Sequence, residues 1–338
     1  MKLSRFKPNQ VLFSPTTQCN LKCPHCDITQ IEKPLSKKAA VRFLSACHKT
    51  GIEWLGFTGG EPFYAQDFLC AVSKKAVGLQ MFFDRIITNA CWFKTKKELL
   101  PVLEKLLDCG YDGRFFVSID AFHAQNLQKA ALFIRTASEI WDRPDMVSIV
   151  CVKGAREKES LNRLKKLAAL LNTEFSGFLT QKAVMKGKEF LIRVIFINLT
   201  PVGRAGRLKN PWDGKWFKDD FCQGPGNVFF VLADGQVKPC CGYSQGTDLL
   251  TIGSIYRHSP GQLLENVQKN LFVSTLFELG FHPIRRQLES FGIRFPGKTT
   301  NHCFFCHYLA HHIPRQELER SLRVLNKILK ARGRKKYS

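Results

Sequence analysis

The sequence has few acidic residues and no long apolar run. Only 28 Asp and Glu stand against 51 Lys and Arg, which gives a formal net charge of +23. No uninterrupted apolar stretch approaches the roughly 20 residues that a membrane-spanning helix needs. The N-terminal string MKLSRFKPNQ is basic, but it lacks the apolar core and the cleavage site of a signal peptide. These absences argue against a membrane or secreted protein, and we expect a soluble cytoplasmic one.

The excess of basic residues predicts an attraction to polyanions, whether nucleic acid, an anionic membrane face or an acidic peptide. The basic residues are scattered except in KILKARGRKK at 327–336, which has the pattern of a basic helical tail. No RNA-recognition signature and no basic patch interleaved with aromatic residues is present. Charge alone therefore does not choose the partner. Nucleic acid is not favoured, but it is not excluded either.

Length and composition indicate a folded, metal-binding protein. A chain of 338 residues can form one large domain and a smaller one. An apolar content of 44% supports a true core. Because the chain carries no secretion signal, its 13 cysteines favour metal binding over disulfides.

Three of these cysteines stand close together in the string CNLKCPHC. Cys19, Cys23 and Cys26 have the spacing C-x3-C-x2-C and follow a strand-like run, VLFSP. Three thiolates can each bind one iron of a 4Fe–4S cluster, and a closed cluster takes four. No fourth cysteine lies nearby, so one iron is left open for a substrate or cofactor. The alternatives are a zinc knuckle, which this spacing matches poorly, or unrelated core cysteines.

Strand-like and helical segments alternate through the first two hundred residues. The strand-like runs are 11–15, 54–58, 81–88, 114–119, 146–152 and 191–199, and the helical patterns are 36–49, 95–109, 124–141 and 157–172. This alternation predicts a parallel sheet with helices outside it. The string TGGEP at 58–62, Asn89 and Asp120 each come just after a strand-like run. In barrels of this class the active site lies at those strand ends.

The cysteine triplet followed by TGGEP resembles the signature of radical S-adenosylmethionine (SAM) enzymes. The resemblance implies an α/β fold, a partial (β/α)6 TIM-like barrel, whose first cluster binds SAM at its open iron. It also implies a set of residues that contact SAM: His25, Gly59, Gly60, Glu61, Asn89, Ser118 and Asp120. The ordinary alternatives are a loop histidine, turn glycines, and caps or turn formers. For Arg204 in TPVGRAGR we expect a surface arginine, with a contact to the cofactor or to an acidic substrate group as the alternative.

The regular alternation ends after about residue 206, at the Pro-, Gly- and Trp-rich string NPWDGKW. The string NVFFVLADGQVKPCC beyond it has the pattern of a β-hairpin with an Asp-Gly turn. The cysteines of this part resemble a Twitch or SPASM-type extension, which implies an auxiliary 4Fe–4S cluster. Its implied ligands are Cys222, Cys240, Cys303 and Cys306. A structural zinc site or core thiols are the alternatives.

The resemblance divides the chain into three parts. Residues 1–205 would form the partial barrel, and residues 206–313 a small C-terminal α+β auxiliary iron–sulfur domain. Residues 314–338 would form the basic C-terminal helix or tail. Because five cysteines are present for four ligand positions, one of Cys240 and Cys241 is spare. We expect Cys241 to be a hydrogen donor to a carbon radical, with Cys240 or a buried small hydrophobe as alternatives.

The strings CNxxCxHC, FTGGE, NxxW, DGxxxPCC and CxxC together resemble radical SAM peptide epimerases. The resemblance implies a cytoplasmic isomerase of ribosomal-peptide biosynthesis that converts L-residues of a precursor peptide to D-residues. A 5′-deoxyadenosyl radical would take a Cα hydrogen, and Cys241 would return one. An electron donor such as flavodoxin or ferredoxin would be needed. A thioether- or carbon–carbon-crosslinking enzyme, a nucleic-acid-modifying radical SAM enzyme and a cluster-based redox sensor are the alternatives.

Overall fold

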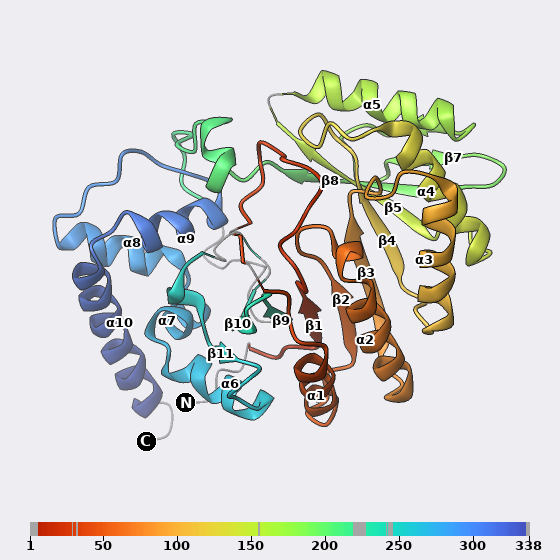
Figure 1. Cartoon of the computed structure of the whole chain (residues 1–338). Helices are drawn as coiled ribbons and strands as arrows, with labels where there is room; N and C mark the ends of the chain where they lie inside the picture. The colour runs from red at the N-terminus through yellow and green to blue at the C-terminus, as the bar shows by residue number, and fades with distance from the viewer. Residues whose placement is uncertain are drawn as a thin grey trace.

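A computed structural model gives the arrangement of the chain around one mixed sheet (Figure 1). It describes residues 6–28, 30–31, 33–154, 156–218, 228–240, 242 and 246–335. The sheet has eleven strands in the order β11-β10-β9-β1-β2-β3-β4-β5-β8-β7-β6. Cys222 and Cys241 lie outside the described residues.

Six strands in the middle of this sheet correspond to the six predicted strand-like runs. They are β1 (Gln10–Phe13), β2 (Trp54–Phe57), β3 (Phe82–Thr88), β4 (Arg114–Ser118), β5 (Val147–Lys153) and β8 (Leu191–Asn198). Each pairs in parallel with its neighbour, so their carboxyl ends lie along one edge. The predicted parallel α/β sheet is confirmed, and its arrangement is that of a partial TIM-like barrel.

Five helices connect the first parallel strands and cover the outer face of the sheet (Figure 1). They are α1 (Lys37–His48), α2 (Gln66–Gly78), α3 (Lys96–Asp108), α4 (Leu127–Ile140) and α5 (Glu157–Leu170), with a 3-10 turn η1 (Pro62–Ala65) before α2. Local sequence sets their ends. Ser36 accepts a hydrogen bond from the Ala39 amide at the start of α1, and Gly51, with φ +83°, follows its end. The side chains between helices and sheet are apolar and include the fully buried Phe57 and Phe115.

Helix α2 and one further part of this region were not predicted. Between α5 and β8 the chain forms an antiparallel hairpin, β6 (Glu174–Ser176) and β7 (Val184–Lys186), which extends the sheet beyond β8. A regular sixth βα repeat was expected here. The two strands have three residues each, which is too short for an alternating pattern to stand out.

The later part of the chain joins the other side of the sheet. The predicted hairpin is confirmed as β9 (Val228–Val231) and β10 (Gln236–Lys238), and Gly235 in its turn has φ +80°. Strand β9 pairs in parallel with β1, and β11 (Gly253–Ser254) completes this edge. The helices α6 (Pro260–Lys269), α7 (Leu271–Leu279), α8 (Phe281–Ser290), α9 (His302–His311) and α10 (Arg315–Lys335) gather beside these strands (Figure 1).

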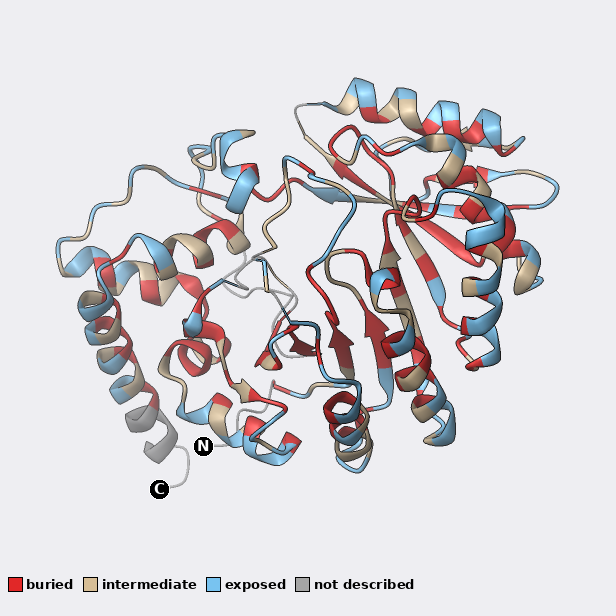
Figure 2. Ribbon diagram, in the orientation of Figure 1, coloured by how far each residue is buried: buried red, intermediate tan, exposed pale blue. Residues whose placement is uncertain are grey.

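The predicted basic tail is the last helix of this group. Along α10, Leu318, Leu322 and Leu325 are buried against α7 and α8, while the opposite side is exposed (Figure 2). Helix α10 is therefore part of the packed structure as well as a carrier of basic residues. Within the described ranges, no helix combines the length and apolar character needed to cross a bilayer.

Replacing Leu322 by Ala should destabilise the protein, because its side chain is only 1% exposed between α10 and its neighbours. We expect a loss of about 2–5 kcal/mol in the free energy of unfolding, measured by urea denaturation. Arg323→Ala is the matched control on the same helix, since the Arg323 side chain is 68% exposed. A control loss as large as that of Leu322→Ala would contradict the packing described.

Candidate active site

The cysteine triplet lies on the loop that follows β1, at the carboxyl edge of the parallel strands. Cys19, Cys23 and Cys26 all line one cavity of about 270 Å³. The other walls come from the ends of β2, β3 and β4 and from β5 and β8, and they include Gly59, Gly60, Asn89, Ser118, Val150 and Ile197. The structure therefore brings the predicted cluster ligands and most predicted SAM contacts into a single cavity.

The three sulfurs do not lie as close together as ligands of one zinc ion. A tetrahedral zinc site with Zn–S bonds of 2.3 Å holds its sulfurs about 3.8 Å apart. Among the described residues, the only His, Cys, Asp or Glu group with ligand atoms all within 4.8 Å is His25, Asp120 and His123. The cysteine sulfurs are therefore spread more widely than a single zinc ion requires. This spread suits a cluster in which each thiolate binds a different iron.

The loop that carries the cysteines requires glycine at positions 59 and 60. The Gly60 amide donates to the Thr16 carbonyl at 2.9 Å, and the Glu61 amide donates to the Gln18 carbonyl at 2.7 Å. A Cβ on Gly60 would lie 2.2 Å from the Gln18 oxygen, and one on Gly59 would lie 2.6 Å from the Thr16 oxygen. The sequence suggested that glycines here admit a ligand. Their first role is to let two backbones come together, and their exposed side then faces the cavity.

Glu61 lies behind the cavity wall and not on it. Its carboxylate is fully buried and accepts hydrogen bonds from the Thr88 hydroxyl and the Asn89 amide, both at 2.8 Å. Burial raises the pKa of Glu61 to about 7, against the lowering effect of these bonds. The side chain thus joins the loop after β2 to the end of β3, and it places Asn89 at the cavity.

Asn89 belongs to a polar network next to Cys19. Its side-chain amide donates to the Asn20 Oδ1 at 2.9 Å and lies 3.7 Å from the Cys19 Sγ. Asn20 in turn donates to the Cys91 carbonyl at 3.2 Å, and the Cys91 amide donates to the Asn89 Oδ1 at 2.9 Å. Cys91 is buried, as predicted for a core residue, but through Asn20 it also contacts the loop that carries the cysteines. Sequence reasoning missed Asn20 and this placement of Cys91. The position of Asn20 directly after Cys19 was the available signal.

Asp120 holds the end of β4 in a similar way. Its buried carboxylate accepts hydrogen bonds from the Phe122, His123 and Val152 amides and lies 2.9 Å from the His123 Nδ1. Burial alone would raise the pKa of Asp120, but the bonds to His123 outweigh it and lower the pKa to about 2. Asp120 therefore fixes the orientation of the His123 ring and does not itself line the cavity.

His25 packs against this pair. Its ring lies edge-on to the His123 ring, with 4.6 Å between centroids, and its buried Nδ1 has no hydrogen-bond partner. Burial lowers the pKa of His25 to about 4, so the ring is neutral at pH 7. His25 and His123 both line the cavity.

Arg204 closes the cavity from the segment that follows β8. Its Nε donates to the Cys26 carbonyl at 3.2 Å. Gly203, with φ +55°, packs so closely on the loop that a Cβ there would lie 2.8 Å from the Asp27 Cα. The Asp27 Oδ2 is buried without a partner, and burial raises the pKa of Asp27 to about 6. Arg204 is thus a wall of the site and not an isolated surface arginine.

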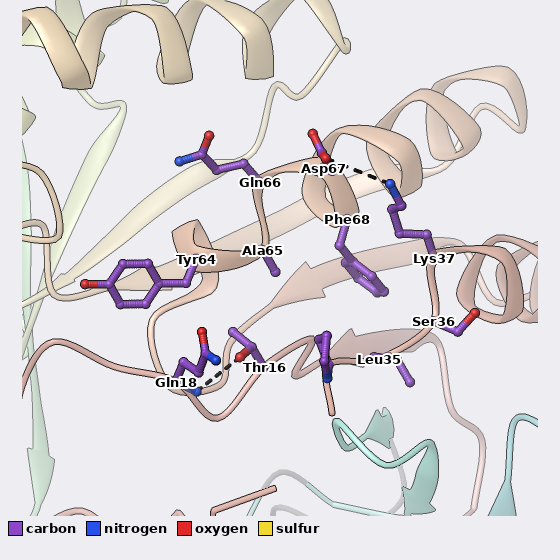
Figure 3. A pocket seen from close by; sticks show the side chains of 11 residues that line it. Thr16, Gln18, Leu35, Ser36, Lys37, Tyr64, Ala65, Gln66, Asp67 and Phe68 are labelled. Atoms are coloured by element: carbon purple, nitrogen blue, oxygen red, sulfur yellow. Dashed lines mark hydrogen bonds and ion pairs between the residues drawn. The ribbon is translucent and has the colours of Figure 1, made fainter. Parts of the chain in front are cut away.

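A larger recess of about 570 Å³ lies on the other side of the segment that leads to Cys19 (Figure 3). Thr16 and Gln18 line it, whereas Thr17 and Cys19 line the cysteine cavity, because alternate residues of this segment point to opposite sides. Residues 34–37, up to the start of α1, and residues 64–68, from η1 into α2, form the rest of its described wall, and no cysteine is among them. The three cysteines therefore belong to the smaller cavity.

The predicted auxiliary ligands are partly described. A Cβ on Gly242 would lie 3.6 Å from both the Cys240 and the Cys303 sulfur, so these two sulfurs lie no more than about 7 Å apart. Cys303 and Cys306 are three residues apart on α9, which places them on one face of the helix. Cys240, Cys303 and this helix face thus come together, while Cys222 and Cys241 lie outside the described residues.

Solved structures of anSMEcpe share the fold of this chain. The structure with bound AdoMet and Cp18Cys peptide matches with a TM-score of 0.56 and 14% identity, over 95% of this chain and 100% of that one. A structure with bound AdoMet matches with a TM-score of 0.54 and 15% identity, over 94% and 100%. No family model and no curated protein sequence matches the chain. The matches confirm the predicted fold.

Glu61 should make the unfolding free energy depend on pH. Its pKa is about 7 in the folded protein, above the ordinary 4.5, so the folded state binds more protons between these values. Its stabilising contribution is complete below pH 4.5 and is lost as pH rises through 7. We expect Glu61→Gln to remove on the order of 2–3 kcal/mol of this pH-dependent loss, measured by urea denaturation of the metal-free protein between pH 4.5 and 8.

The comparison rests on the slope against pH, so any constant cost of the amide cancels. Asp108→Asn, at the end of α3, serves as the control carboxylate. Equal slopes in the wild type and Glu61→Gln would contradict the buried carboxyl described here.

Proposed function

We propose that this chain is a radical SAM enzyme that epimerises residues of a ribosomally made precursor peptide from L to D. The observation that carries the proposal is the convergence of Cys19, Cys23 and Cys26 on one cavity at the carboxyl edge of a parallel sheet. The fold shared with anSMEcpe, solved with AdoMet and a peptide, supports it. The division into residues 1–205, 206–313 and 314–338 belongs to the same proposal.

The three cysteines would hold a 4Fe–4S cluster, whose open iron would bind SAM. When bound, the cluster and SAM supply a 5′-deoxyadenosyl radical that can remove a hydrogen atom from a peptide Cα. The residues around them bind and orient the cofactor. His25, Gly59, Gly60, Asn89 and Ser118 line the cavity, and Glu61 and Asp120 hold its polar walls in place from behind. These walls exclude water and stray hydrogen donors from the reacting carbon.

Cys241 is the proposed hydrogen donor. Its thiol gives a hydrogen atom to the face of the Cα opposite to the one attacked, which inverts the centre and leaves a thiyl radical. One electron and one proton then restore the thiol. Cys222, Cys240, Cys303 and Cys306 would hold the auxiliary 4Fe–4S cluster that delivers this electron. The closeness of the Cys240 and Cys303 sulfurs supports this ligand set.

The partners follow from this chemistry. The substrate would be the precursor peptide, and a flavodoxin or ferredoxin would supply electrons to the SAM-binding cluster. An open iron–sulfur cluster is destroyed by oxygen, so we place the enzyme in a reducing cytoplasm.

Cys241→Ala should abolish D-residue formation but leave SAM cleavage intact. The assay is anaerobic incubation with candidate peptides in deuterated water, followed by mass spectrometry and chiral amino-acid analysis. The wild type should add one mass unit for each epimerised residue, because the exchangeable thiol hydrogen becomes deuterium. A loss of two hydrogens would instead identify a crosslinking enzyme and would contradict the proposal.

Cys70→Ala is the control, since Cys70 is a buried cysteine of α2 outside the cavity. It should retain epimerisation. Epimerisation by Cys241→Ala at the wild-type rate would assign the donor elsewhere, and the same assay on Cys240→Ala tests the other member of the pair.

Iron content tests the two clusters separately. The reconstituted wild type should hold about eight iron atoms, since two 4Fe–4S clusters are proposed. The Cys303→Ala/Cys306→Ala double variant should lose about half of this iron and keep the spectral response of the remaining cluster to SAM. A loss of that response, or full iron retention, would count against an auxiliary cluster at α9.

A further inference from the structure

The face of the parallel strands opposite the helices lines a second cavity, which lies toward the amino ends of the strands from the cavity with the cysteines and is called the lower cavity. Side chains that alternate along a strand point to the same face, so Phe116 and Ser118 of β4 both face the interior. Strand pairing aligns Phe116 with Ser148 and Arg193, and it aligns Ser118 with Val150 and Ile195. In the second row, which we call the upper one, Ser118 and Val150 line the cysteine cavity, whereas Ile195 lines the cavity below it. The lower row lines a cavity of about 440 Å³.

The two rows are separated by two residues along each strand, which is about 6.6 Å. An extended peptide has the same repeat, since its side chains i and i+2 lie on one face. A peptide that places its reacting residue in the cysteine cavity can therefore place a side chain about two positions away in the lower cavity. The lower cavity is within reach of the same substrate.

The lower cavity has an excess of positive charge. Its wall contains Arg114, Lys182 and Arg193, and among the residues that the structure describes Asp145 is its only acidic member. Asp145 is already neutralised by ion pairs with Arg114 and Arg143. In the described part of the chain, no ion pair engages Lys182 or Arg193, and both are exposed. Two cations thus remain for an anionic group.

Apart from Ser148 and Gln181, the uncharged residues of the wall are apolar. Val184, Leu191 and Ile195 line it, and the Leu191 side chain is 49% exposed although it faces this space. The Phe116 ring is covered by the Arg85 guanidinium, which lies 4.5 Å from its centroid. Arg85 therefore occupies one face of that ring, which reduces its use for stacking on a nucleic-acid base, the usual way in which single-stranded nucleic acid is held. A carboxylate side chain with apolar neighbours fits better.

We infer that the lower cavity binds an acidic residue of the peptide substrate, about two positions from the residue that is modified, through Arg193 and Lys182. The inference rests on the proposed function and deepens it, because it names an acidic and apolar segment as the substrate class. It also gives a local use to part of the strong positive charge of the chain.

The test is a selection of phage-displayed random dodecapeptides on the reconstituted enzyme with SAM, under anaerobic conditions. Peptides selected by the wild type should contain Asp and Glu at least threefold more often than those selected by Arg193→Glu. In the best wild-type peptide, changing Glu to Gln should weaken binding at least tenfold to the wild type and less than twofold to Arg193→Glu. This cycle isolates the pair from the general field of a basic protein.

Arg286→Glu is the matched control, because Arg286 is an exposed arginine of α8 outside the cavity and carries the same charge change. It should behave as the wild type, and Arg193→Lys should keep most of the acidic preference. Three outcomes would each overturn the inference. The first two are equal effects of Arg193→Glu and Arg286→Glu, and no acidic enrichment with the wild type. The third is a labelled single-stranded RNA that outcompetes every selected peptide and is released by Arg193→Glu.

The outcome is separable from that of the proposed function. Peptides that are epimerised without regard to their acidic residue would leave the function and overturn the lower-cavity site. Acidic peptides that bind through Arg193 but are never modified would do the reverse. Folding of each variant is checked by its circular dichroism and by its iron content.

Discussion

The site depends on the pairing of two backbones that come from different strand ends. The loop that carries the cysteines accepts hydrogen bonds at Thr16 and Gln18 from the segment that contains Gly60. These contacts allow no side chain at either glycine, because a Cβ would meet backbone oxygen at under 3 Å. They help to fix the cysteine loop relative to the end of β2, where the three thiols share one cavity. The string TGGEP thus has a structural role first, since it holds the loop that carries the cysteines.

Buried carboxylates extend the same principle to the next two strands. Glu61 joins the end of β2 to the end of β3, and Asp120 joins β4 to β5 through the Val152 amide. Both sit behind the residues that line the cavity, and their pKa values move in opposite directions because only Asp120 has a histidine partner. Most of the polar groups that would touch a cofactor are therefore neutral or oriented by a buried charge, which is how a cavity can bind a charged ligand without being rearranged by it.

Sequence patterns predicted what repeats and what clusters. The six parallel strands and four of their helices follow from hydrophobic periodicity, and the cysteine triplet follows from its spacing. The hairpin β6–β7 was missed because three-residue strands carry no period. The Asn20–Asn89–Cys91 network was missed for a different reason. Its members are 69 or more residues from Asn20 along the chain, and only the fold shows that they meet. Periodicity reports elements, whereas such networks are a property of their packing.

The two cavities along the parallel strands differ in the residues that line them. Polar groups held by buried carboxylates line the upper cavity, where the cysteines lie, and three cations line the lower one, of which Arg114 is paired with Asp145. A full barrel would fill this lower space with side chains. Here the antiparallel β6–β7 hairpin takes the place of a regular repeat, and its turn and second strand contribute Lys182 and Val184 to the lower wall. The hairpin that the sequence concealed therefore supplies part of the wall of the lower cavity and one of its cations.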